Sequence, residues 1–482
     1  MEKEKVANRI YNLRKSKNLK QSELAKELGV SDKAISKWEQ GTVLPTLEAL
    51  CKISSFFGVS IDSLLADRAK VEPIKRVKGG METIKELYKI GRGPSSSHTM
   101  GPERICKEFK ENNPEADSFK VVLYGSLALT GIGHGTDRIV RETLAPIKTK
   151  VEFNRIKKSL PHPNTMEIFA YKGGEEINSV RAYSIGGGEV LKENEEAKLH
   201  ERIYTLDSFE AISKYCKESN MRLSEYVEKI EGDGYHDFIQ EVWEAMKEAI
   251  ERGINTDGVL PGGLDVKRKA KYLFNQRHID ETPETKENRL VCAYAYAMGE
   301  ENASGGKIVT APTCGACGVV PAVLYYYQKK RGYSDKEIHK ALAAAAVVGM
   351  LVKTNASISG AQCGCQAEIG TACSMAAAAL GELFDMSIEQ IEYAAEIALE
   401  HHLGLTCDPI GGLVQIPCIE RNAVAAMRAI NAVNIANFLT DTRKISLDLI
   451  IQTMYETGID ISEKYRETST GGMAKLYKAF ED

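Results

Sequence analysis

The sequence predicts a multidomain α+β protein, with an all-α unit at the N-terminus, a central α/β domain and an all-α domain at the C-terminus. The first observation is length, because 482 residues exceed one ordinary domain and two or three are expected. The second is periodicity: apolar residues follow a helical period at both ends of the chain, whereas β-rich runs alternate with helical patterns in between. The third is composition, since 43% hydrophobic and 27% charged residues are typical of a globular protein with ample core.

Residues 1–66 have the pattern of short amphipathic helices. In the segment QSELAKELGVSDKAISKWEQ, Gly29 marks the break where one helix turns into the next, and apolar residues stand at helical spacings on both sides: Leu24, Ala25, Leu28, Val30, Ile35 and Trp38. This is the layout of a helix-turn-helix, with Ser31 or Asp32 as the cap of the second helix. The whole unit resembles the Cro and phage-repressor type of DNA-binding domain.

The charge of this unit is consistent with DNA as its partner. From Met1 to Gln40 there are ten Lys and Arg against six Asp and Glu, although the formal net charge of the whole chain is -4. A basic surface neutralises phosphates, and the resemblance places five side chains at DNA: Gln21, Ser31, Lys33, Ser36 and Lys37. The alternative is a small helical interaction module that reads no DNA.

A charged stretch without a periodic apolar face, residues 67–80, is predicted to be a linker. We expect the α/β domain at 81–225. Its helix is predicted at Gly101–Lys110, and its strands fall in three β-rich runs: Lys120–Leu129, Thr165–Tyr171 and Val180–Ile185.

The distinctive part of this domain is GRGPSSSHTMGPERICKEF, a loop of small polar residues that leads into an amphipathic helix. Hydroxyl groups and free backbone N–H groups at the positive end of a helix are suited to a carboxylate or a phosphate. His98 adds a group that exchanges a proton near neutral pH. The alternative is an ordinary cap and loop rich in Ser and Thr. The glycines of GSLALTGIGHGTD, around His134, again indicate a close approach of the backbone.

The remainder is predicted to be helical, as a neck at 226–285 and a C-terminal domain at 286–482. Ala-rich faces allow these helices to pack closely. The helical pattern is interrupted at GGKIVTAPTCGACGVVPAV, at NASISGAQCGCQ and at GLTCDPIGGLVQIPCIERN. Such breaks leave free backbone donors where helices begin, which is how many ligand sites are built.

Five of the eleven cysteines are concentrated between Asn355 and Asn422: Cys363, Cys365, Cys373, Cys407 and Cys418. Taken singly, each could be a buried apolar thiol. Together they suit an iron-sulfur cluster better than a zinc ribbon, since no CxxC pair repeats and the thiols come from widely spaced loops. No secretory signal follows the start, and the apolar run ALAAAAVVGMLV is too short to cross a bilayer. We therefore expect reduced thiols in a cytoplasmic protein without a membrane partner.

From about Met81 to Gly472 the chain resembles the iron-sulfur-dependent L-serine dehydratases, or L-serine ammonia-lyases, with their β and α parts fused in one polypeptide. The matching motifs are GPSSSHTMGP, GSLALTGIGHGTD, PHPN, YSIGGG, TAPT, SISGAQCGCQAEIG, EHHLGLTCDPIGGLVQIPCIERN and ETSTGG. The C-terminal all-α domain would then be the catalytic domain, and L-serine would be converted to pyruvate and ammonia through an aminoacrylate.

The resemblance also implies a site, residue by residue. The ligands of a [4Fe-4S] cluster would be Cys365, Cys407 and Cys418, and the fourth iron, without a protein thiolate, would act as a Lewis acid on the substrate. His98 would be the base, with Ser95, Ser96, Ser97 and Thr99 holding the substrate. Three further candidates for substrate contact are Asn355, Ser357 and Ser359, for which a structural role at a helix start is the alternative. By analogy we expect a homodimer.

The chain departs from the better-known members in having Cys314 and Cys317 after TAPT, and Cys363 beside a proposed ligand. Extra sulfur could supply a fourth ligand, tune the potential or favour another substrate, such as L-threonine or L-cysteine. A different alternative is a transcription regulator whose dehydratase-like part senses an amino acid or iron and oxygen status. A pyridoxal-phosphate enzyme is disfavoured, because Lys307 is the only lysine close to these motifs and lacks a phosphate-binding setting.

Overall fold

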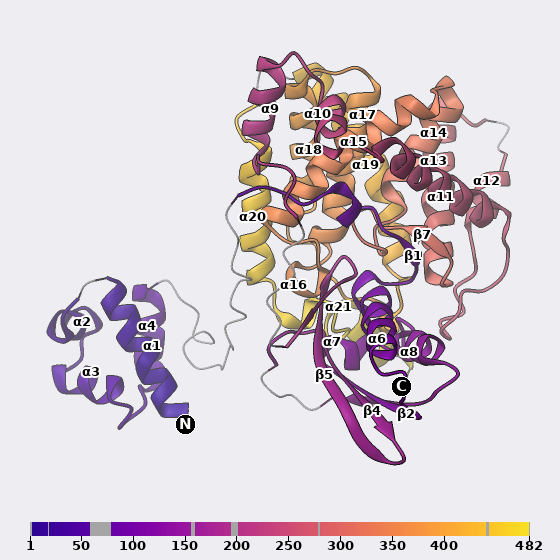
Figure 1. Ribbon diagram of the computed structural model, residues 1–482. Helices are drawn as coiled ribbons and strands as arrows, with labels where there is room; N and C mark the ends of the chain where they lie inside the picture. Colours follow the sequence, from indigo (N-terminus) through magenta and orange to yellow (C-terminus); the bar gives the residue numbers. More distant parts are fainter. Residues whose placement is uncertain are drawn as a thin grey trace. The chain divides into compact units, whose positions relative to one another are not determined.

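The computed structural model describes residues 2–17, 19–57, 79–155, 160–193, 201–277, 280–439 and 443–481. The chain divides into two compact units, one of Met1–Lys75 with Lys158–Pro161 and one of Arg76–Lys157 with His162–Asp482. All but the last two residues of the predicted linker, 67–80, lie outside the described residues. Figure 1 shows the elements of both units.

The first unit contains the helices α1 (Glu2–Ser16), α2 (Gln21–Leu28), α3 (Asp32–Glu39) and α4 (Leu47–Phe57). Their apolar faces meet in a small core that includes Leu24, Ile35 and Ile53. Gly29 ends α2 in the left-handed region (φ 65°), and the Ser31 hydroxyl caps α3 by accepting from the Ala34 N–H at 3.2 Å. The predicted helix-turn-helix layout is thus confirmed.

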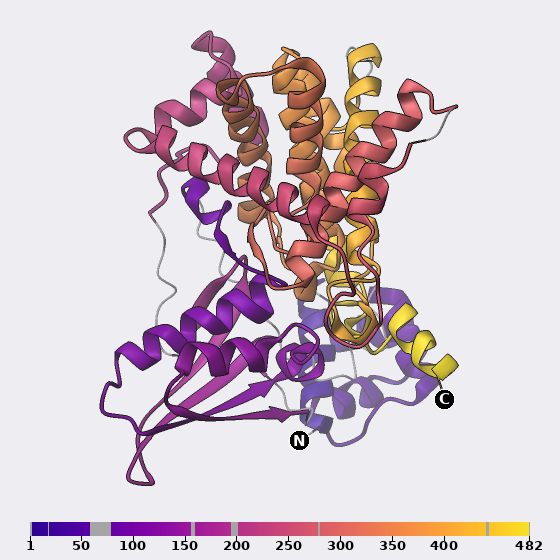
Figure 2. The same cartoon turned by 90° about the vertical axis from the view of Figure 1, so that its right-hand side faces the viewer.

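The second unit contains a five-stranded sheet in the order β3-β2-β4-β5-β6. Only the pair β2–β3 is parallel, and the other three pairs are antiparallel. The strands are β2 (Ser118–Tyr124), β3 (Lys148–Asn154), β4 (Thr165–Lys172), β5 (Glu175–Gly186) and β6 (Glu189–Lys192). The helices α6 (Gly101–Glu111) and α8 (Thr136–Leu144) cover one face of this sheet, as Figures 1 and 2 show. The central α/β domain is therefore confirmed.

One strand prediction was wrong at its end. The β-rich run Lys120–Leu129 was expected to be a single strand, but β2 stops at Tyr124 and Gly125–Thr130 form the short helix α7. Gly125 has a φ of 55°, a conformation that an extended strand does not allow. The chain therefore turns here, and the turn carries Ser126 into the interior.

The C-terminal part is almost entirely helical, and Ala-rich helices such as α15 and α17 pack side by side in its core. The three glycine-bearing breaks fall where predicted, before α14, α17 and α19. The helices are α9 (Phe209–Glu218), α10 (Leu223–Glu231), α11 (Tyr235–Asn255), α12 (Ala270–Asn275), α13 (Pro283–Ala303), α14 (Val319–Arg331), α15 (Asp335–Asn355), α16 (Gly360–Cys363), α17 (Thr371–Leu383), α18 (Ile388–Glu400), α19 (Cys418–Leu439), α20 (Leu447–Asp460) and α21 (Gly472–Glu481).

The segment that precedes the sheet domain is packed into the helical part. The strand β1 (Ile90–Arg92) pairs antiparallel with β7 (Lys307–Val309) in a two-stranded sheet. Leu87 and Tyr88, just before β1, belong to the core of the helical part, whereas the core of the sheet domain is formed by residues such as Ile105 and Ile168. The exact boundary between the two domains stays a prediction. Among the described residues, none of the helices has both the length and the apolar character needed to cross a membrane.

Candidate active site

The loop that carries His98 is held by its own polar side chains. The Ser95 hydroxyl accepts from the His98 N–H at 3.1 Å, and the Ser95 N–H donates to the Thr99 hydroxyl at 3.2 Å. These two bonds close the turn η2 (Ser96–Met100), which runs directly into α6. All five residues from Ser95 to Thr99 are buried, so this loop lies inside the molecule.

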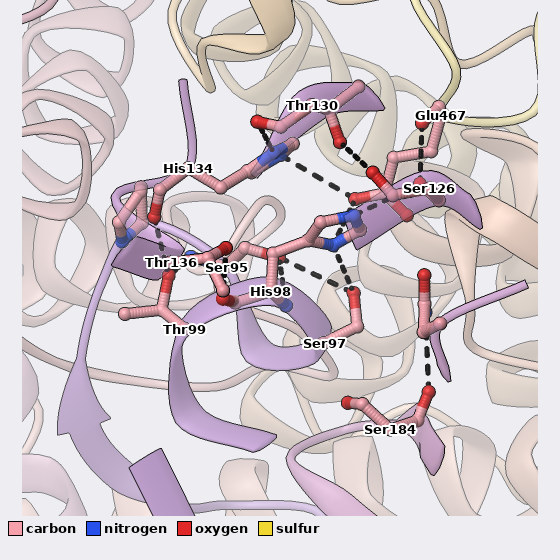
Figure 3. A network of polar contacts seen from close by, with 12 residues as sticks. Ser95, Ser97, His98, Thr99, Ser126, Thr130, His134, Thr136, Ser184 and Glu467 are labelled. Carbon is pink, nitrogen blue, oxygen red and sulfur yellow. Dashed lines mark hydrogen bonds and ion pairs between the residues drawn. The ribbon is translucent and has the colours of Figure 1, made fainter. Parts of the chain in front are cut away.

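The imidazole of His98 has a polar partner at each nitrogen. Its Nε2 hydrogen-bonds with the Ser126 hydroxyl at 3.0 Å, and its Nδ1 lies 3.0 Å from the Ser97 hydroxyl. The Nδ1 atom is also 3.4 Å from Oε1 of Glu467. Figure 3 shows the ring between these three residues, which come from three separate segments of the chain.

A second histidine, His134, stacks on His98 with ring centroids 4.3 Å apart. Its Nδ1 hydrogen-bonds to the main-chain carbonyl of Thr130 at 3.0 Å, and its Nε2 lies 3.6 Å from Oε1 of Glu467. Burial lowers the pKa of His134 to about 4. Burial, with an added effect of His134, lowers the pKa of His98 well below its usual range. Both rings are therefore neutral at pH 7, and a neutral imidazole is the form that accepts a proton.

Glu467 links the two histidines to the cysteine-bearing loop. Its N–H donates to the main-chain carbonyl of Cys407 at 2.7 Å, and its own carbonyl accepts from the Ser126 hydroxyl at 2.7 Å. Burial raises the pKa of the Glu467 carboxyl well above its usual range, and Glu368 raises it further. The SSSHT loop and the cysteines thus meet through the ETSTGG segment near the C-terminus.

Within the described part of the chain, the ligand atoms of Cys365, Cys407 and Glu368 all lie within 4.8 Å of one another. The Glu368 carboxylate accepts from the Thr313 hydroxyl at 2.7 Å. Gly360 makes this approach possible, because a Cβ atom at that position would lie 2.6 Å from Oε2 of Glu368 and 3.4 Å from Sγ of Cys407. This close packing explains why position 360 of the SISGAQCGC motif is a glycine.

The third predicted ligand, Cys418, begins α19, is buried, and is close enough to Cys365 and Glu368 to interact with them electrostatically, although it is not among the atoms within 4.8 Å. A hydrogen bond with Cys407 lowers the pKa of Cys365, burial opposes this effect, and the guanidinium of Arg421 lowers the pKa further. Burial and then the charge of Cys365 raise the pKa of Cys418. Three buried sulfurs from separate segments, with an arginine beside them, form a donor set that fits an iron-sulfur cluster.

Four other cysteines of this region point to other partners. The Cys373 thiol donates to the main-chain carbonyl of Ala425 at 3.2 Å, and Sγ of Cys363 packs against Gly458. Sγ of Cys314 lies 3.4 Å from Sδ of Met100, and the Cys317 thiol faces the carbonyl of Met298 at 3.8 Å. Each of the four thiols thus has a packing contact of its own outside the Cys365 group.

The weaker candidates for substrate contact lie at helix ends. Asn355 ends α15, and its amide donates to the carbonyl of Asp207 at 2.7 Å. The Ser357 hydroxyl accepts from the Ser359 N–H at 3.1 Å, and Ser359 is the residue before α16. These contacts hold the loop that leads to Cys365, and substrate contact by the three residues stays a prediction.

The predicted DNA contacts lie on or beside α2 and α3. Lys33 and Lys37 are exposed on α3, and Ser36 is half-buried between them. Gln21 begins α2, and its amide donates to Glu39 at 2.7 Å. Ser31 is the cap of α3, as described above.

Sequence reasoning missed Ser126 and Glu467, and it noted His134 only as part of a glycine-rich turn. Glu467 has a φ of 57°, which is uncommon for a residue other than glycine. The motifs GSLALTGIGHGTD and ETSTGG were visible in the sequence. Nothing in their local pattern, however, shows that residues 341 positions apart share a hydrogen bond.

Comparison with known proteins agrees with this geometry. The family model for the serine dehydratase alpha chain matches residues 185–474, that for the beta chain matches residues 83–150, and a helix-turn-helix model matches residues 10–64. L-serine dehydratase TdcG of Escherichia coli is 42% identical over 81% of this chain and 98% of its own length. The L-serine dehydratases of Streptomyces coelicolor and Helicobacter pylori are each 39% identical, over 81% and 82% of this chain and 98% and 99% of their own lengths.

The fold and the site define a lyase that carries a helix-turn-helix unit of the DNA-binding type. The chain belongs to the serine dehydratase family.

Proposed function

We propose that this protein converts L-serine to pyruvate and ammonia at a [4Fe-4S] cluster held by Cys365, Cys407 and Cys418. The observation that carries the proposal is the junction at Glu467, which brings a neutral, buried His98 and the buried thiols into one site. The relatives named L-serine dehydratase, at about 40% identity over most of their length, support the same substrate.

The three thiolates would hold the cluster and leave one iron without a protein sulfur, and that iron would supply Lewis acidity toward the carboxylate and hydroxyl of the substrate. The chain's own residues would do the rest. His98, neutral at pH 7, accepts the α-proton, which is too weakly acidic to leave without a positioned base. The hydroxyl group departs from the β-carbon, and the resulting aminoacrylate tautomerises and takes up water to give pyruvate and ammonia.

The serines of the loop have two roles in this scheme. Ser95 and Thr99 fix the turn, and Ser97 lies against the base, so that the imidazole is held in one orientation. Ser96 and the free backbone donors of the turn are the groups that we assign to the substrate carboxylate. Burial of the whole loop excludes water from the proton transfer.

The test is pyruvate release from L-serine, L-threonine and L-cysteine by anaerobically prepared protein. The proposal predicts the highest kcat/KM with L-serine. If L-threonine or L-cysteine is preferred, the protein is instead a related lyase that acts on that amino acid. If the protein with its full iron content turns over none of the three, the sensor function is favoured.

We further propose that the first unit binds DNA and that the protein acts as a homodimer in the cytoplasm. The exposed lysines of α3 and the helix-turn-helix match support DNA as the partner. Helix-turn-helix proteins read paired half-sites best as dimers. Sedimentation of the full chain with and without duplex DNA tests this, and a monomer in both conditions would contradict it.

A further inference from the structure

The hydrogen bonds of Ser126 determine where its single hydroxyl proton lies. The Oγ atom is 2.7 Å from the main-chain carbonyl oxygen of Glu467, and a carbonyl oxygen only accepts. The hydroxyl proton therefore points to Glu467. At its other contact, 3.0 Å from Nε2 of His98, the same oxygen has to accept, so Nε2 carries a proton.

It follows that the lone pair of the neutral imidazole is on Nδ1. This nitrogen faces the Ser97 hydroxyl at 3.0 Å and the Glu467 carboxyl at 3.4 Å. The N–H of the same Glu467 donates to the carbonyl of Cys407 at 2.7 Å, so Nδ1 faces a residue that contacts the cysteine-bearing loop. Nε2 is on the opposite side, against α7.

We propose that Ser126 is a positioning residue that holds His98 in its Nε2–H tautomer and thereby makes Nδ1 the nitrogen that accepts the substrate proton. This inference rests on the proposed function for the identity of the reaction. The carboxylate that orients a catalytic histidine in hydrolases has the same role, since it determines which nitrogen is free to act as the base. Here a hydroxyl, itself oriented by a backbone carbonyl, does so.

Hydrogen bonds of both main-chain groups hold Ser126 in position. Its N–H donates to the carbonyl of Pro163 at 2.8 Å, and its carbonyl accepts from the Thr130 hydroxyl at 3.0 Å. The side chain is 3% exposed, so water does not replace it as the partner of Nε2. A serine that served only to satisfy the Glu467 carbonyl would need no contact with His98.

The first test is the Ser126→Ala variant of the full, iron-loaded chain. We expect kcat to fall by about 10- to 100-fold, as for other residues that orient a functional histidine, with KM within about threefold of the wild type. The Ser126 hydroxyl accepts from Nε2–H, and such a bond stabilises the charged imidazolium more than the neutral ring. Its loss is therefore expected to lower the pKa of His98 and to move the acidic limb of the kcat/KM profile to lower pH. Unchanged kcat, or a lower kcat with an unmoved acidic limb, would overturn the proposal.

A matched control is Ser374→Ala. The Ser374 hydroxyl is also buried and also donates to a main-chain carbonyl, that of Ala395 at 2.6 Å, but it lies within α17 away from His98. This variant reports what the loss of a buried serine hydroxyl does to stability alone. Its kcat and its acidic limb are expected to match the wild type, even if its melting temperature falls as far as that of Ser126→Ala.

The second test does not depend on turnover. In full-length protein labelled with nitrogen-15 in histidine, the His98 signal is assigned with the His98→Gln variant. We expect a protonated Nε2 and an unprotonated Nδ1 in the wild type, and loss of this preference in Ser126→Ala. A protonated Nδ1 in the wild type would refute the inference. Absence of pyruvate formation by the wild type would instead refute the proposed function and leave the tautomer to be decided by this measurement.

Discussion

At the scale of single residues, the proposed chemistry depends on two stacked imidazoles that stay neutral because they are buried. His98 and His134 share the Glu467 carboxyl at 3.4 and 3.6 Å, and neither ring has access to solvent. A charged imidazole would lack the water that stabilises it. Protonation of these rings is therefore less favourable in the folded chain than in the unfolded chain, and this difference makes the free energy of folding depend on pH.

This linkage predicts a pH dependence of stability. An unfolded histidine has a pKa of about 6.5, whereas that of folded His134 is about 4. Between these values the unfolded chain binds the proton and the folded chain does not, so the contribution of His134 is present above pH 6.5 and is lost as the pH falls. The loss amounts to about 3 kcal/mol between pH 7 and pH 4.

The measurement is urea unfolding of the wild type and of His134→Gln over this pH range. Glutamine does not titrate, so the difference in free energy of unfolding between the two proteins should change with pH in the direction and by the amount given above. A difference that stays constant from pH 7 to pH 4 would show that His134 has the same pKa in the folded and unfolded states.

At the scale of elements, the site depends on two short helical segments, α16 and η2. The helix α16 begins at Gly360, and its lack of a side chain lets Glu368 and Cys407 approach. The turn η2 is closed by Ser95 before α6 begins. At Gly360 a larger residue would separate the groups that have to meet.

Gly360→Ala is therefore expected to be destabilising, although alanine is the better helix former by about 1 kcal/mol. A Cβ atom 2.6 Å from Oε2 of Glu368 forces that carboxylate to move, and overpacking of this kind costs about 1 to 3 kcal/mol. The expected result is a lower melting temperature and a lower iron content.

The control is Gly315→Ala, where the added Cβ would lie at an ordinary 3.5 Å from the same carboxylate. It should retain the wild-type iron content. If Gly360→Ala behaved like this control, the close approach at α16 would not be needed.

Local pattern explains which elements were predictable. Helical periodicity and glycine breaks placed the helices of the C-terminal domain, and Gly29 with Ser31 placed the turn between α2 and α3. The end of β2 was missed because YGSLAL is as apolar as a strand, and the turn at Gly125 depends on a backbone angle that the pattern does not show. Composition and spacing describe neighbours in sequence, not the path of the backbone.

At the scale of the whole molecule, a lyase of the serine dehydratase family is joined to a unit of the DNA-binding type. The site itself is assembled from segments that are far apart in sequence: the SSSHT loop, α7, the loop before α19 and the ETSTGG segment. The cysteines and His98 could be proposed from motifs, because motifs are local. The roles of Ser126 and Glu467 could not, because they arise only when the two ends of the enzyme part meet.

The DNA-binding unit has its own prediction. Lys33 and Lys37 are exposed on α3, so each is expected to contact one phosphate. Lys33→Ala and Lys37→Ala should each weaken binding of the full chain to duplex DNA and lower the magnitude of the log Kd against log salt slope by about 1. Lys52→Ala on α4, which removes an ion pair with Glu48, is the control with the wild-type slope. Fluorescence anisotropy at several salt concentrations measures all three, and equal slopes would contradict DNA contact by α3.

The most direct test of the account compares Cys365→Ser with Cys363→Ser in anaerobic protein, by iron content and by pyruvate released from L-serine. The two thiols are two positions apart, but Cys365 lies in the group with Cys407 and Glu368, whereas Cys363 packs against Gly458. The account predicts that Cys365→Ser loses both iron and turnover, and that Cys363→Ser retains both. Retention of iron and turnover by Cys365→Ser would contradict it.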